Sequence, residues 1–362
     1  MEIAVIGGGH GCYAAAVDLT EKGHNVRLWR RDATAFGPVM DTGIINVTDA
    51  KGTRPVKIAK PTADLAQAMR GAELIVLPLP CTTHLSLAPQ LANLWEDGQV
   101  AYLPPGTFGG MIYAKAAHDA GNTAIVAFAE TGTLPYLARK QGVDEVRISV
   151  YATRLPTGVF PAKDSDRALK VISQAYPSVE PLQDLLDGAL MNAGPIIHPP
   201  LIMMNAGPLE HFDAWDIHNE GTQPAIRRVT DALDNERIAI REALDYGAPH
   251  FPLADHYDDS RDEWMYGNSS HDKLTDSGDW REHIVLTDQH NMREDTAIGL
   301  SFLTSVAKLA GIDAPLASGF LAIGSGITGD DLYATGRTLG SLGLGALDLA
   351  AMRELLEGGF SS

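Results

Sequence analysis

The sequence predicts an α/β protein in two parts, an N-terminal doubly wound sheet of the Rossmann type followed by an all-α C-terminal helical domain. In the first half of the chain, short apolar runs alternate with helix-forming segments, the pattern of a parallel sheet covered by helices on both faces. From about residue 185 the pattern becomes helical. The length of 362 residues exceeds what one hydrophobic core usually fills. We therefore expect two domains, residues 1–187 and 188–362.

The first domain alternates strand and helix along the chain. We expect strands at 2–6, 25–29, 74–79, 99–103 and 123–128, and helices at 14–21, 62–70, 85–94 and 111–120. A different pattern follows, with a strand at 146–154 that 158–161 could pair with, a helix at 166–176 and a last strand at 178–182. This change predicts a mixed sheet with an antiparallel edge.

The second domain is expected to be a set of helices. Residues 227–246 carry charges between regularly spaced apolar side chains and end at Gly247, which predicts an amphipathic helix. Further helices are predicted at 294–310, 315–323 and 346–356. Residues 255–290 are polar and weakly periodic, which predicts a loop or short-helix insertion.

The charge of the chain argues against a nucleic-acid partner. It has 46 acidic and 28 basic residues, for a formal net charge of −18, and would repel a phosphate backbone. No apolar run reaches the roughly 18 residues that span a bilayer, and the first residues lack a signal-peptide pattern. We therefore expect no membrane partner and a cytoplasmic location. Cys12 and Cys81 have no CxxC spacing, so we expect reduced, structural cysteines.

A glycine-rich turn lies between the first strand and the first helix. A dinucleotide fold needs small residues for the tight turn, for close approach to the pyrophosphate and for packing of helix on strand. Gly7 and Gly9 occupy the first two positions, and Cys12 occupies the third beside Gly11. We expect these four residues and His10 to bind the cofactor phosphates at the helix N-terminus. A purely structural turn is the alternative.

The end of the second strand bears on the choice of cofactor. An acid there would bind the ribose 2′-hydroxyl of NAD, whereas this chain has Arg30 and Arg31 followed by Asp32. Two guanidinium groups suit a 2′-phosphate, so NADP is the preferred cofactor. NAD remains possible if Asp32 turns inward.

Two later loops also follow predicted strands. Pro80 ends the run 77–80, and Gly106 and Thr107 lie in the glycine-rich run 104–110. Ligands bind at such carboxyl ends of strands in open sheets, so we expect all three residues to contact the cofactor. Ordinary turns are the alternative.

His198 is the candidate proton donor. It lies in an apolar run where the helical domain begins, and transfer of a hydride to a C=O or C=N bond needs a nearby proton. Asp295, at the start of a predicted helix, is a candidate to orient this imidazole. A hydrogen-bonded core histidine and a first-turn acid are the structural alternatives. Seven other histidines lie between His211 and His290 without the spacing of a metal site, so no metal is expected.

These residues carry a resemblance to a known family. The turn at 7–12, the loop 105–110, Glu130-Thr131, the run 192–199, Asn205-Ala206, the run 236–240, Glu294-Asp295 and the tail 336–344 together resemble the opine (octopine and nopaline) dehydrogenases, and most of all bacterial members. The resemblance extends over nearly the whole chain. It departs at Cys12, where the motif has glycine, and at Arg30, where a bacterial relative has an acid.

The resemblance implies a reaction and roles for several residues. These enzymes condense an amino acid with a 2-oxo acid such as pyruvate and reduce the imine with NAD(P)H. His198 would be the general acid/base and Asp295 its partner, with Asn192 and Asn205 near the substrate and Glu130 near the cofactor. The small-molecule partners would be an amino acid and a 2-oxo acid. We also expect a homodimer.

A product with two carboxylates needs cationic groups to bind it. Arg154 and Arg293 are the first candidates for substrate binding, with Arg227 and Arg228 as further ones. Surface roles are the alternative for each.

Two other functions remain open at this stage. One is a ketopantoate reductase or glycerol-3-phosphate dehydrogenase type of enzyme, which would use a lysine near the start of the helical domain, and residues 185–209 contain none. The other is an NADP-binding sensor without turnover, which leaves His198 unexplained.

Overall fold

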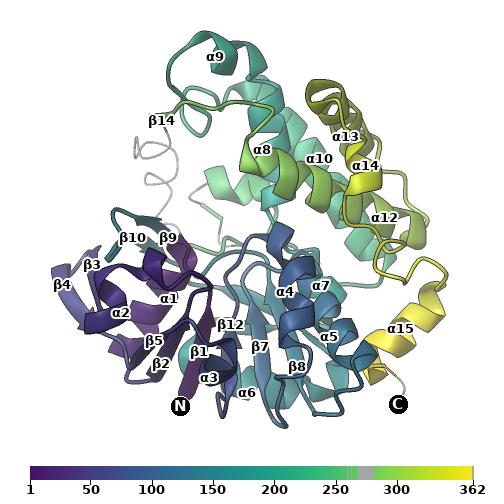
Figure 1. Ribbon diagram of the computed structural model, residues 1–362. Coiled ribbons are helices and arrows are strands. Elements are labelled where there is room, and N and C mark those ends of the chain that lie inside the picture. The colour runs from purple at the N-terminus through teal and green to yellow at the C-terminus, as the bar shows by residue number, and fades with distance from the viewer. Residues whose placement is uncertain (259, 262, 268–280, 361–362) are drawn as a thin grey trace. The chain divides into compact units, whose positions relative to one another are not determined.

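The computed structural model describes residues 1–258, 260–261, 263–267 and 281–360. The chain forms two compact units, Met1–Ala189 with Glu354–Ser362, and Leu190–Arg353 (Figure 1). The predicted insertion at 255–290 lies partly outside the described residues.

The first unit is built on an eight-stranded sheet with the order β12-β11-β8-β7-β6-β1-β2-β5. Its strands are β1 (Glu2–Ile6), β2 (Asn25–Trp29), β5 (Lys60–Thr62), β6 (Leu74–Val76), β7 (Val100–Leu103), β8 (Ala127–Thr131), β11 (Leu155–Phe160) and β12 (Val179–Pro181). Six of them follow the Rossmann order, with the switch point between β1 and β6. The predicted doubly wound sheet is therefore confirmed.

The edge of this sheet is antiparallel, as predicted. β11 runs antiparallel to β8 and parallel to β12. The pairing predicted between 146–154 and 158–161 is wrong, because β11 adds to the large sheet while residues 145–151 join a second one. The helices of this unit are α1 (His10–Glu21), α2 (Pro38–Thr42), α3 (Leu65–Met69), α4 (His84–Leu91), α5 (Gly109–Asp119), α6 (Ser165–Ala175) and α7 (Leu185–Ala189).

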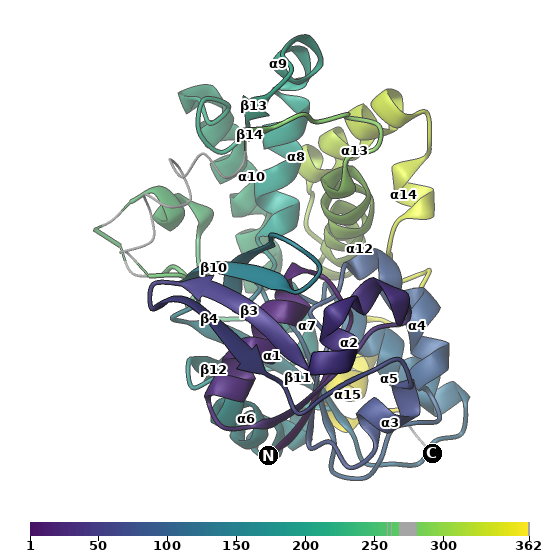
Figure 2. The same cartoon turned by 60° about the vertical axis from the view of Figure 1, so that its left-hand side comes forward.

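A second, four-stranded sheet packs against α1 with the order β4-β3-β10-β9 (Figure 2). Its strands are β3 (Ile44–Asp49), β4 (Gly52–Lys57), β9 (Tyr136–Lys140) and β10 (Glu145–Tyr151). Only β10 was predicted from the sequence. Side chains of α1 and of both sheets, including Val5, Ala15, Val47 and Ile148, share one hydrophobic core. Helix α1, which follows the glycine-rich turn, is thus enclosed between two sheets.

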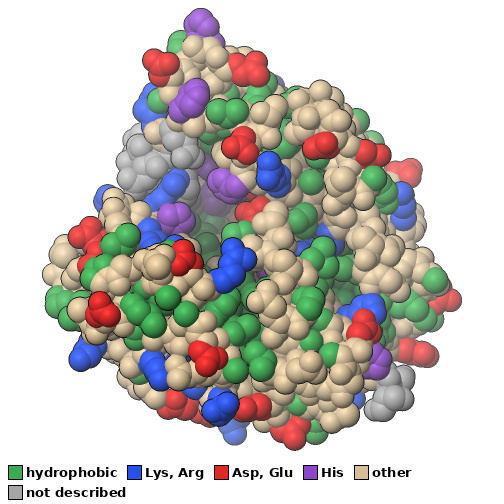
Figure 3. All heavy atoms as spheres, in the orientation of Figure 1, with side chains coloured by type: hydrophobic (Ala, Val, Ile, Leu, Met, Phe, Trp, Pro, Cys, Tyr) green, Lys and Arg blue, Asp and Glu red, His purple; other side chains and the backbone are tan. Residues whose placement is uncertain are grey.

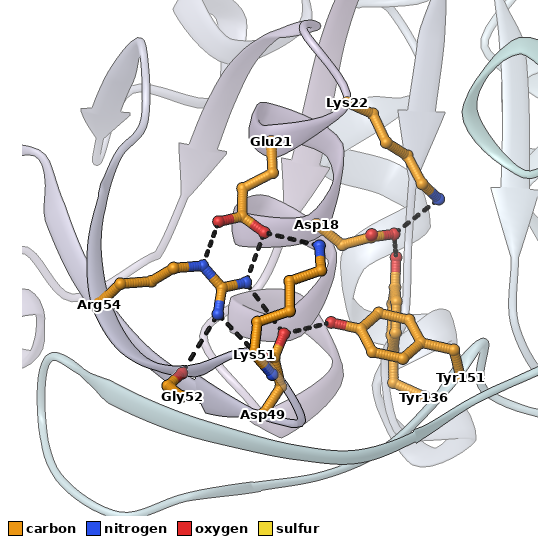
Figure 4. A network of polar contacts seen from close by, with 9 residues as sticks. All are labelled: Asp18, Glu21, Lys22, Asp49, Lys51, Gly52, Arg54, Tyr136 and Tyr151. Atoms are coloured by element: carbon orange, nitrogen blue, oxygen red, sulfur yellow. Dashed lines mark hydrogen bonds and ion pairs between the residues drawn. The ribbon is translucent and has the colours of Figure 1, made fainter.

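Arg54 joins this second sheet to α1 (Figure 4). Its guanidinium donates to both carboxylate oxygens of Glu21, at 2.5 and 2.6 Å, and to both of Asp49, at 2.7 and 2.9 Å. Tyr151 also donates to Asp49, at 3.1 Å. The hydrogen bonds from Arg54 hold the pKa of both carboxyl groups below their usual range.

The C-terminal residues return to the first unit. Helix α15 (Leu349–Gly358) is followed by Phe360, whose ring stacks on His118 at 5.0 Å between centroids and meets Phe160 edge-on at 5.6 Å. The helix predicted at 346–356 is present, but residues 354–362 do not belong with the helical unit as expected. Its sequence pattern shows an apolar face without showing which unit covers it.

The second unit is helical, as predicted. Its helical segments are α8 (Gly194–Met203), α9 (Ala206–His211), α10 (Pro224–Ala243), η4 (Leu253–Tyr257), η6 (Met292–Leu300), α12 (Ser301–Ala310), α13 (Pro315–Thr328) and α14 (Leu332–Thr335). A short ribbon pairs β13 (Trp215–Asp216) with β14 (Arg281–Glu282). The single helix predicted at 294–310 is two segments, because η6 is a π-helix that continues into α12.

Acidic and basic side chains are interspersed on the face drawn in Figure 3. Among the described residues, no helix is both long and apolar enough to cross a membrane.

Candidate active site

The turn after β1 has the geometry of a phosphate-binding turn. Gly7 has φ +121°, and a Cβ there would lie 2.5 Å from Leu79 Cδ2 and 2.7 Å from Cys12 Sγ. Gly9 precedes α1 without any side-chain cap, and a Cβ at Gly9 would meet no atom within 4 Å. No side chain of the N-cap residue covers the start of α1, and the space above Gly9 is open. These features fit the phosphates of a dinucleotide.

Cys12 has the packing role expected of the third motif position. Its Sγ lies 3.6 Å from the carbonyl oxygens of Ile6 and Pro78, and burial raises the pKa of the thiol to about 12. Cys12 and Cys81 are both free cysteines. Cys12 is thus a buried neutral thiol.

His10 and Gly11 connect the turn to its surroundings. His10 Nδ1 accepts the backbone N–H of Lys140 at 2.7 Å, which joins the start of α1 to β9. A Cβ on Gly11 would lie 2.9 Å from Leu134 Cδ2 and 3.2 Å from Pro78 Cβ. A direct contact of either residue with the cofactor stays a prediction.

The three residues after β2, Arg30, Arg31 and Asp32, differ in their hydrogen-bond partners. Arg30 extends across Gly8, where a Cβ would lie 2.6 Å from Arg30 Cδ, and its guanidinium donates to the carbonyl of Ala35. Asp32 accepts hydrogen bonds from the hydroxyl and backbone N–H of Thr34, at 2.6 and 2.9 Å, which lower the pKa of Asp32. Arg31 is exposed and makes no hydrogen bond or ion pair with the described part of the chain.

The loop after β7 depends on a buried carboxylate. Glu130 is fully buried and accepts the backbone N–H groups of Phe108, at 2.7 Å, and Gly110, at 2.9 Å. A Cβ at Gly106 would lie 2.2 Å from Glu130 Oε2, and Thr107 has φ +50°. The sequence suggested that Glu130 contacts the cofactor. Glu130 supports the loop through these two hydrogen bonds, and its contact with the cofactor stays a prediction.

Pro80 follows β6 and initiates a short helical turn. Its carbonyl accepts the backbone N–H of Thr83 at 2.9 Å and the Thr83 hydroxyl at 2.8 Å. Pro80 is exposed. Its proximity to a cofactor stays a prediction.

His198 and Asp295 form a hydrogen-bonded pair within the helical unit. His198 Nδ1 lies 2.7 Å from Asp295 Oδ2, although the two residues are far apart in the sequence. The His198 side chain keeps 25% of its exposure, against 12% for Asp295. A carboxylate at Nδ1 favours the tautomer in which Nδ1 carries the hydrogen. His198 Nε2 makes no hydrogen bond to any residue that the structure describes.

Asn291 supports Asp295 and was not predicted. Its Nδ2 donates to Asp295 Oδ2 at 2.8 Å, so the same carboxylate oxygen accepts from Asn291 and from His198. Asn291 is buried and immediately precedes η6. The spacing of four residues before Asp295 was the only sequence signal for it.

Close packing of α8 against η6 brings the pair together. A Cβ at Gly194 would lie 2.4 Å from Asp295 Oδ1, and a Cβ at Gly299 would lie 2.2 Å from Pro195 Cγ. Asn192 Oδ1 accepts the backbone N–H of Gly194 at 3.0 Å, so Asn192 organises the first turn of α8. A contact of Asn192 with substrate stays a prediction.

Asn205 bonds to other groups of the protein, and its predicted role in substrate binding stays a prediction. It is buried, and its Nδ2 donates to the carbonyls of Leu201, at 2.8 Å, and Gly221, at 3.0 Å. Its Oδ1 accepts from Trp215 Nε1 at 3.1 Å. Asn205 therefore connects the end of α8 to the following loop.

The candidate arginines have different partners. Arg154 forms a bidentate ion pair with Glu180, at 2.6 and 2.7 Å, so its guanidinium is already paired within the first unit. Arg293 is 68% exposed and lies 3.4 Å from Asp288. Arg227 lies over the ring of Tyr257, 4.4 Å from its centroid. Of Arg154 and Arg293, Arg293 has the more exposed side chain and the longer ion-pair distance. In the described part of the chain, no group of His, Cys, Asp or Glu could hold a metal ion.

Two family models each match a different part of the chain. Residues 181–328 match the family model described as NAD/NADP octopine/nopaline dehydrogenase, alpha-helical domain. Residues 2–120 match the model described as NAD-dependent glycerol-3-phosphate dehydrogenase N-terminus. The nucleotide-binding half is thus of a type shared by several dehydrogenases, and the helical half distinguishes the family.

Several known proteins are similar to the chain over nearly its whole length. The chain is 27% identical to an opine dehydrogenase of Arthrobacter sp. (strain 1C), over 98% of each protein. It resembles the structure of octopine dehydrogenase in complex with NADH and agmatine, with a TM-score of 0.73, 17% identity, and coverage of 99% of this chain and 98% of that one. It also resembles NADP⁺-bound yersinopine dehydrogenase, with a TM-score of 0.65, 13% identity and 99% and 98% coverage. Over nearly its whole length the chain is thus similar to opine dehydrogenases, and its helical part matches the octopine/nopaline dehydrogenase model.

Proposed function

We propose that this protein reductively condenses the amino group of an amino acid with a 2-oxo acid such as pyruvate, and catalyses the reverse oxidation. The observation that carries the proposal is the His198–Asp295 pair, with Nδ1 anchored at 2.7 Å and the rest of the imidazole partly exposed. This arrangement suits a general acid that must meet a small substrate at Nε2. The relative with an opine dehydrogenase name supports the same reaction.

The chemistry assigns a proton-transfer role to His198. The amine adds to the ketone carbon and water leaves, which gives an imine. Protonated at Nε2, His198 donates its proton toward the substrate nitrogen or the departing oxygen, and Asp295 stabilises the imidazolium through Nδ1. When bound, the nicotinamide nucleotide supplies the hydride that completes the C–H bond. Gly7, Gly9 and the start of α1 would hold its pyrophosphate.

NADP is our proposed preference between the two cofactors. Arg30 and exposed Arg31 follow β2, where the ribose 2′-position is expected. The carboxylate of Asp32 accepts the hydroxyl and backbone N–H of Thr34 at Oδ1, which orients this acid within its own turn. Titration of protein fluorescence with NADP⁺ and NAD⁺ measures the preference, and tighter binding of NAD⁺ would refute it.

We further propose that Arg293 binds a substrate carboxylate. It is exposed, belongs to the same segment as Asp295, and its ion-pair partner in the described part of the chain is Asp288, an exposed acid 3.4 Å away. Arg154 is not proposed, because Glu180 already pairs with it. Arg293→Gln should raise the substrate KM by about tenfold while the NADPH dissociation constant is unchanged. An unchanged KM would exclude this role.

The expected homodimer stays a prediction. Light scattering, which measures the molar mass in solution, tests it.

The decisive experiment is a two-component substrate screen. NADPH oxidation is followed with pyruvate and other 2-oxo acids, each with and without a panel of amino acids, and products are identified by mass spectrometry. We expect turnover only when both are present, with a product heavier than the amino acid by the oxo acid minus one oxygen atom. Oxidation of NADPH by the oxo acid alone would instead indicate a hydroxy-acid dehydrogenase.

A further inference from the structure

A second histidine lies against the candidate general acid. The rings of His198 and His218 are 5.8 Å apart between centroids and nearly perpendicular, at 85°. This is the separation and angle of an edge-to-face aromatic contact. His218 comes from the loop between β13 and α10, so the His198 ring is approached from a segment separate from η6, which supplies Asp295.

The turn that carries His218 is held by a buried acid. Asp216 is almost fully buried, and its Oδ1 accepts the backbone N–H groups of His218, at 2.9 Å, and Asn219, at 3.1 Å. The carbonyl of Asp216 accepts the N–H of Gly221 at 2.9 Å, and the Thr222 hydroxyl donates to the carbonyl of Ile217 at 2.9 Å. The backbone on which His218 stands is therefore closely constrained.

The same turn is anchored to α8, the helix that carries His198. Asn205 donates to the carbonyls of Leu201 on α8 and Gly221 in the turn, and it accepts from Trp215. A Cβ at Gly221 would lie 2.7 Å from the Cα of Ile217, so the turn has no space for a side chain there. The anchor sets the position of His218 relative to the helix that bears His198.

We infer that His218 is a positioning residue that orients the ring of His198 for proton transfer in the proposed reaction. The hydrogen bond from Nδ1 to Asp295 fixes one point of the imidazole, and a ring can still tilt about a single hydrogen bond. Contact with a perpendicular ring removes that freedom and fixes the direction of Nε2. The inference rests on the proposed role of His198 as general acid.

The test separates the ring of His218 from its polarity. His218→Phe keeps an aromatic ring, and His218→Gln keeps hydrogen-bonding capacity without the ring. We expect His218→Gln to lower kcat by about tenfold, since small misplacement of a catalytic group is costly, and His218→Phe to stay within about threefold of wild type. In both variants the NADP⁺ dissociation constant and the pH dependence of kcat should match the wild type.

His211→Gln is the matched control, because the ring of His211, the last residue of α9, contacts Phe212 and makes no ring contact with His198 among the described residues. It should retain wild-type kcat. If His218→Gln has wild-type kcat, or if His218→Phe loses as much activity as His218→Gln, the positioning role is refuted. Circular dichroism and thermal unfolding show whether each variant is folded. If His218→Gln does not fold, a kcat for His218→Phe below one tenth of wild type overturns the inference.

Failure of the inference differs from failure of the proposed function. Near-wild-type turnover in His198→Gln would refute the general acid itself, whatever the His218 variants do. Loss of activity in His198→Gln together with full activity in His218→Gln would refute only the positioning role.

Discussion

At the scale of single residues, the site depends on an imidazole with one nitrogen fixed. Asp295 binds His198 Nδ1, and Asn291 binds the same carboxylate oxygen, so the acid is itself oriented before it orients the histidine. Such support is typical of a general acid, because proton transfer needs a defined direction as well as a suitable pKa. The pair therefore carries more functional information than either residue alone.

Replacing His198 should remove the proton donor without affecting the nucleotide site. We expect His198→Ala to lower kcat on the order of 100-fold and to leave the NADPH dissociation constant within about twofold of wild type. Steady-state kinetics and fluorescence titration measure the two quantities.

Asp295→Asn should lower kcat less than His198→Ala does, and it should change the pH profile of kcat. An unchanged profile in Asp295→Asn would count against the pair.

Several residues that look functional in the sequence are used internally. Glu130, Asn205 and Arg154 were candidates for contact with cofactor or substrate, and each bonds to other groups of the protein. A motif shows that a certain residue type is needed at a position. It does not show whether that residue supports a loop or binds a ligand. His198 and Asp295 could be proposed from chemistry and resemblance, whereas Asn291 and His218 emerged only from their contacts.

At the scale of elements, the site depends on how closely η6 approaches α8. The π-helical geometry of η6 was not predicted, because a hydrophobic pattern does not distinguish it clearly from an α-helix. Such segments are frequent at functional sites. Gly299 allows the approach, since any side chain there would overlap Pro195 on α8.

Gly299→Ala should therefore destabilise the helical unit. The added methyl group would overlap Pro195 and force the two segments apart, which typically costs about 1–3 kcal/mol of the free energy of unfolding. Gly319→Ala on α13 is the control, because its Cβ would meet no atom within 4 Å and should stabilise by about 0.5–1 kcal/mol. Urea denaturation measures both. Equal effects of the two substitutions would contradict this account of the packing.

The second sheet should contribute stability that depends on pH. Arg54 lowers the pKa of Asp49 and Glu21 in the folded protein, so this stabilisation is present above the unfolded carboxyl pKa of about 4 and is lost as pH falls through the folded values. We expect Arg54→Met to cost about 1–2 kcal/mol near pH 7 and progressively less below pH ~4. Urea unfolding across pH measures the difference.

Lys57→Met is the matched control for Arg54→Met. It removes a cation from the same strand, and Lys57 makes no ion pair with the described residues. It should have a small effect at every pH. If the Arg54→Met difference does not shrink in acid, the carboxylates are not the source of its effect.

At the scale of the whole molecule, the chain returns to its first unit after forming the second. Leu356 is buried, and Phe360 packs on His118 and Phe160. The last residues therefore contribute to the sheet unit although they follow the helical unit in sequence. Cut at the predicted boundary, the N-terminal half lacks the C-terminal residues of its own unit, which remain on the half that carries the helical unit.

Truncation after Arg353 should weaken the first unit. Loss of Leu356 and Phe360 exposes apolar surface, so we expect the Tm of this unit to fall by about 5 °C or more. Removing only Ser361 and Ser362 is the control and should leave the Tm unchanged. Differential scanning calorimetry measures both. An unchanged Tm after the longer truncation would show that these contacts contribute little.

The sequence by itself determined the class of the fold and the glycine-rich turn, because local patterns encode them. A strand, a tight turn and a helix are neighbours in the chain, and Gly7 and Gly9 show their requirement directly. Tertiary structure decided the rest. The second sheet, the return of the C-terminus and the assembly of His198 with Asp295, Asn291 and His218 all join segments far apart in sequence. These contacts depend on how distant segments pack together. The hydrophobic pattern of one segment does not show which other segment it packs against.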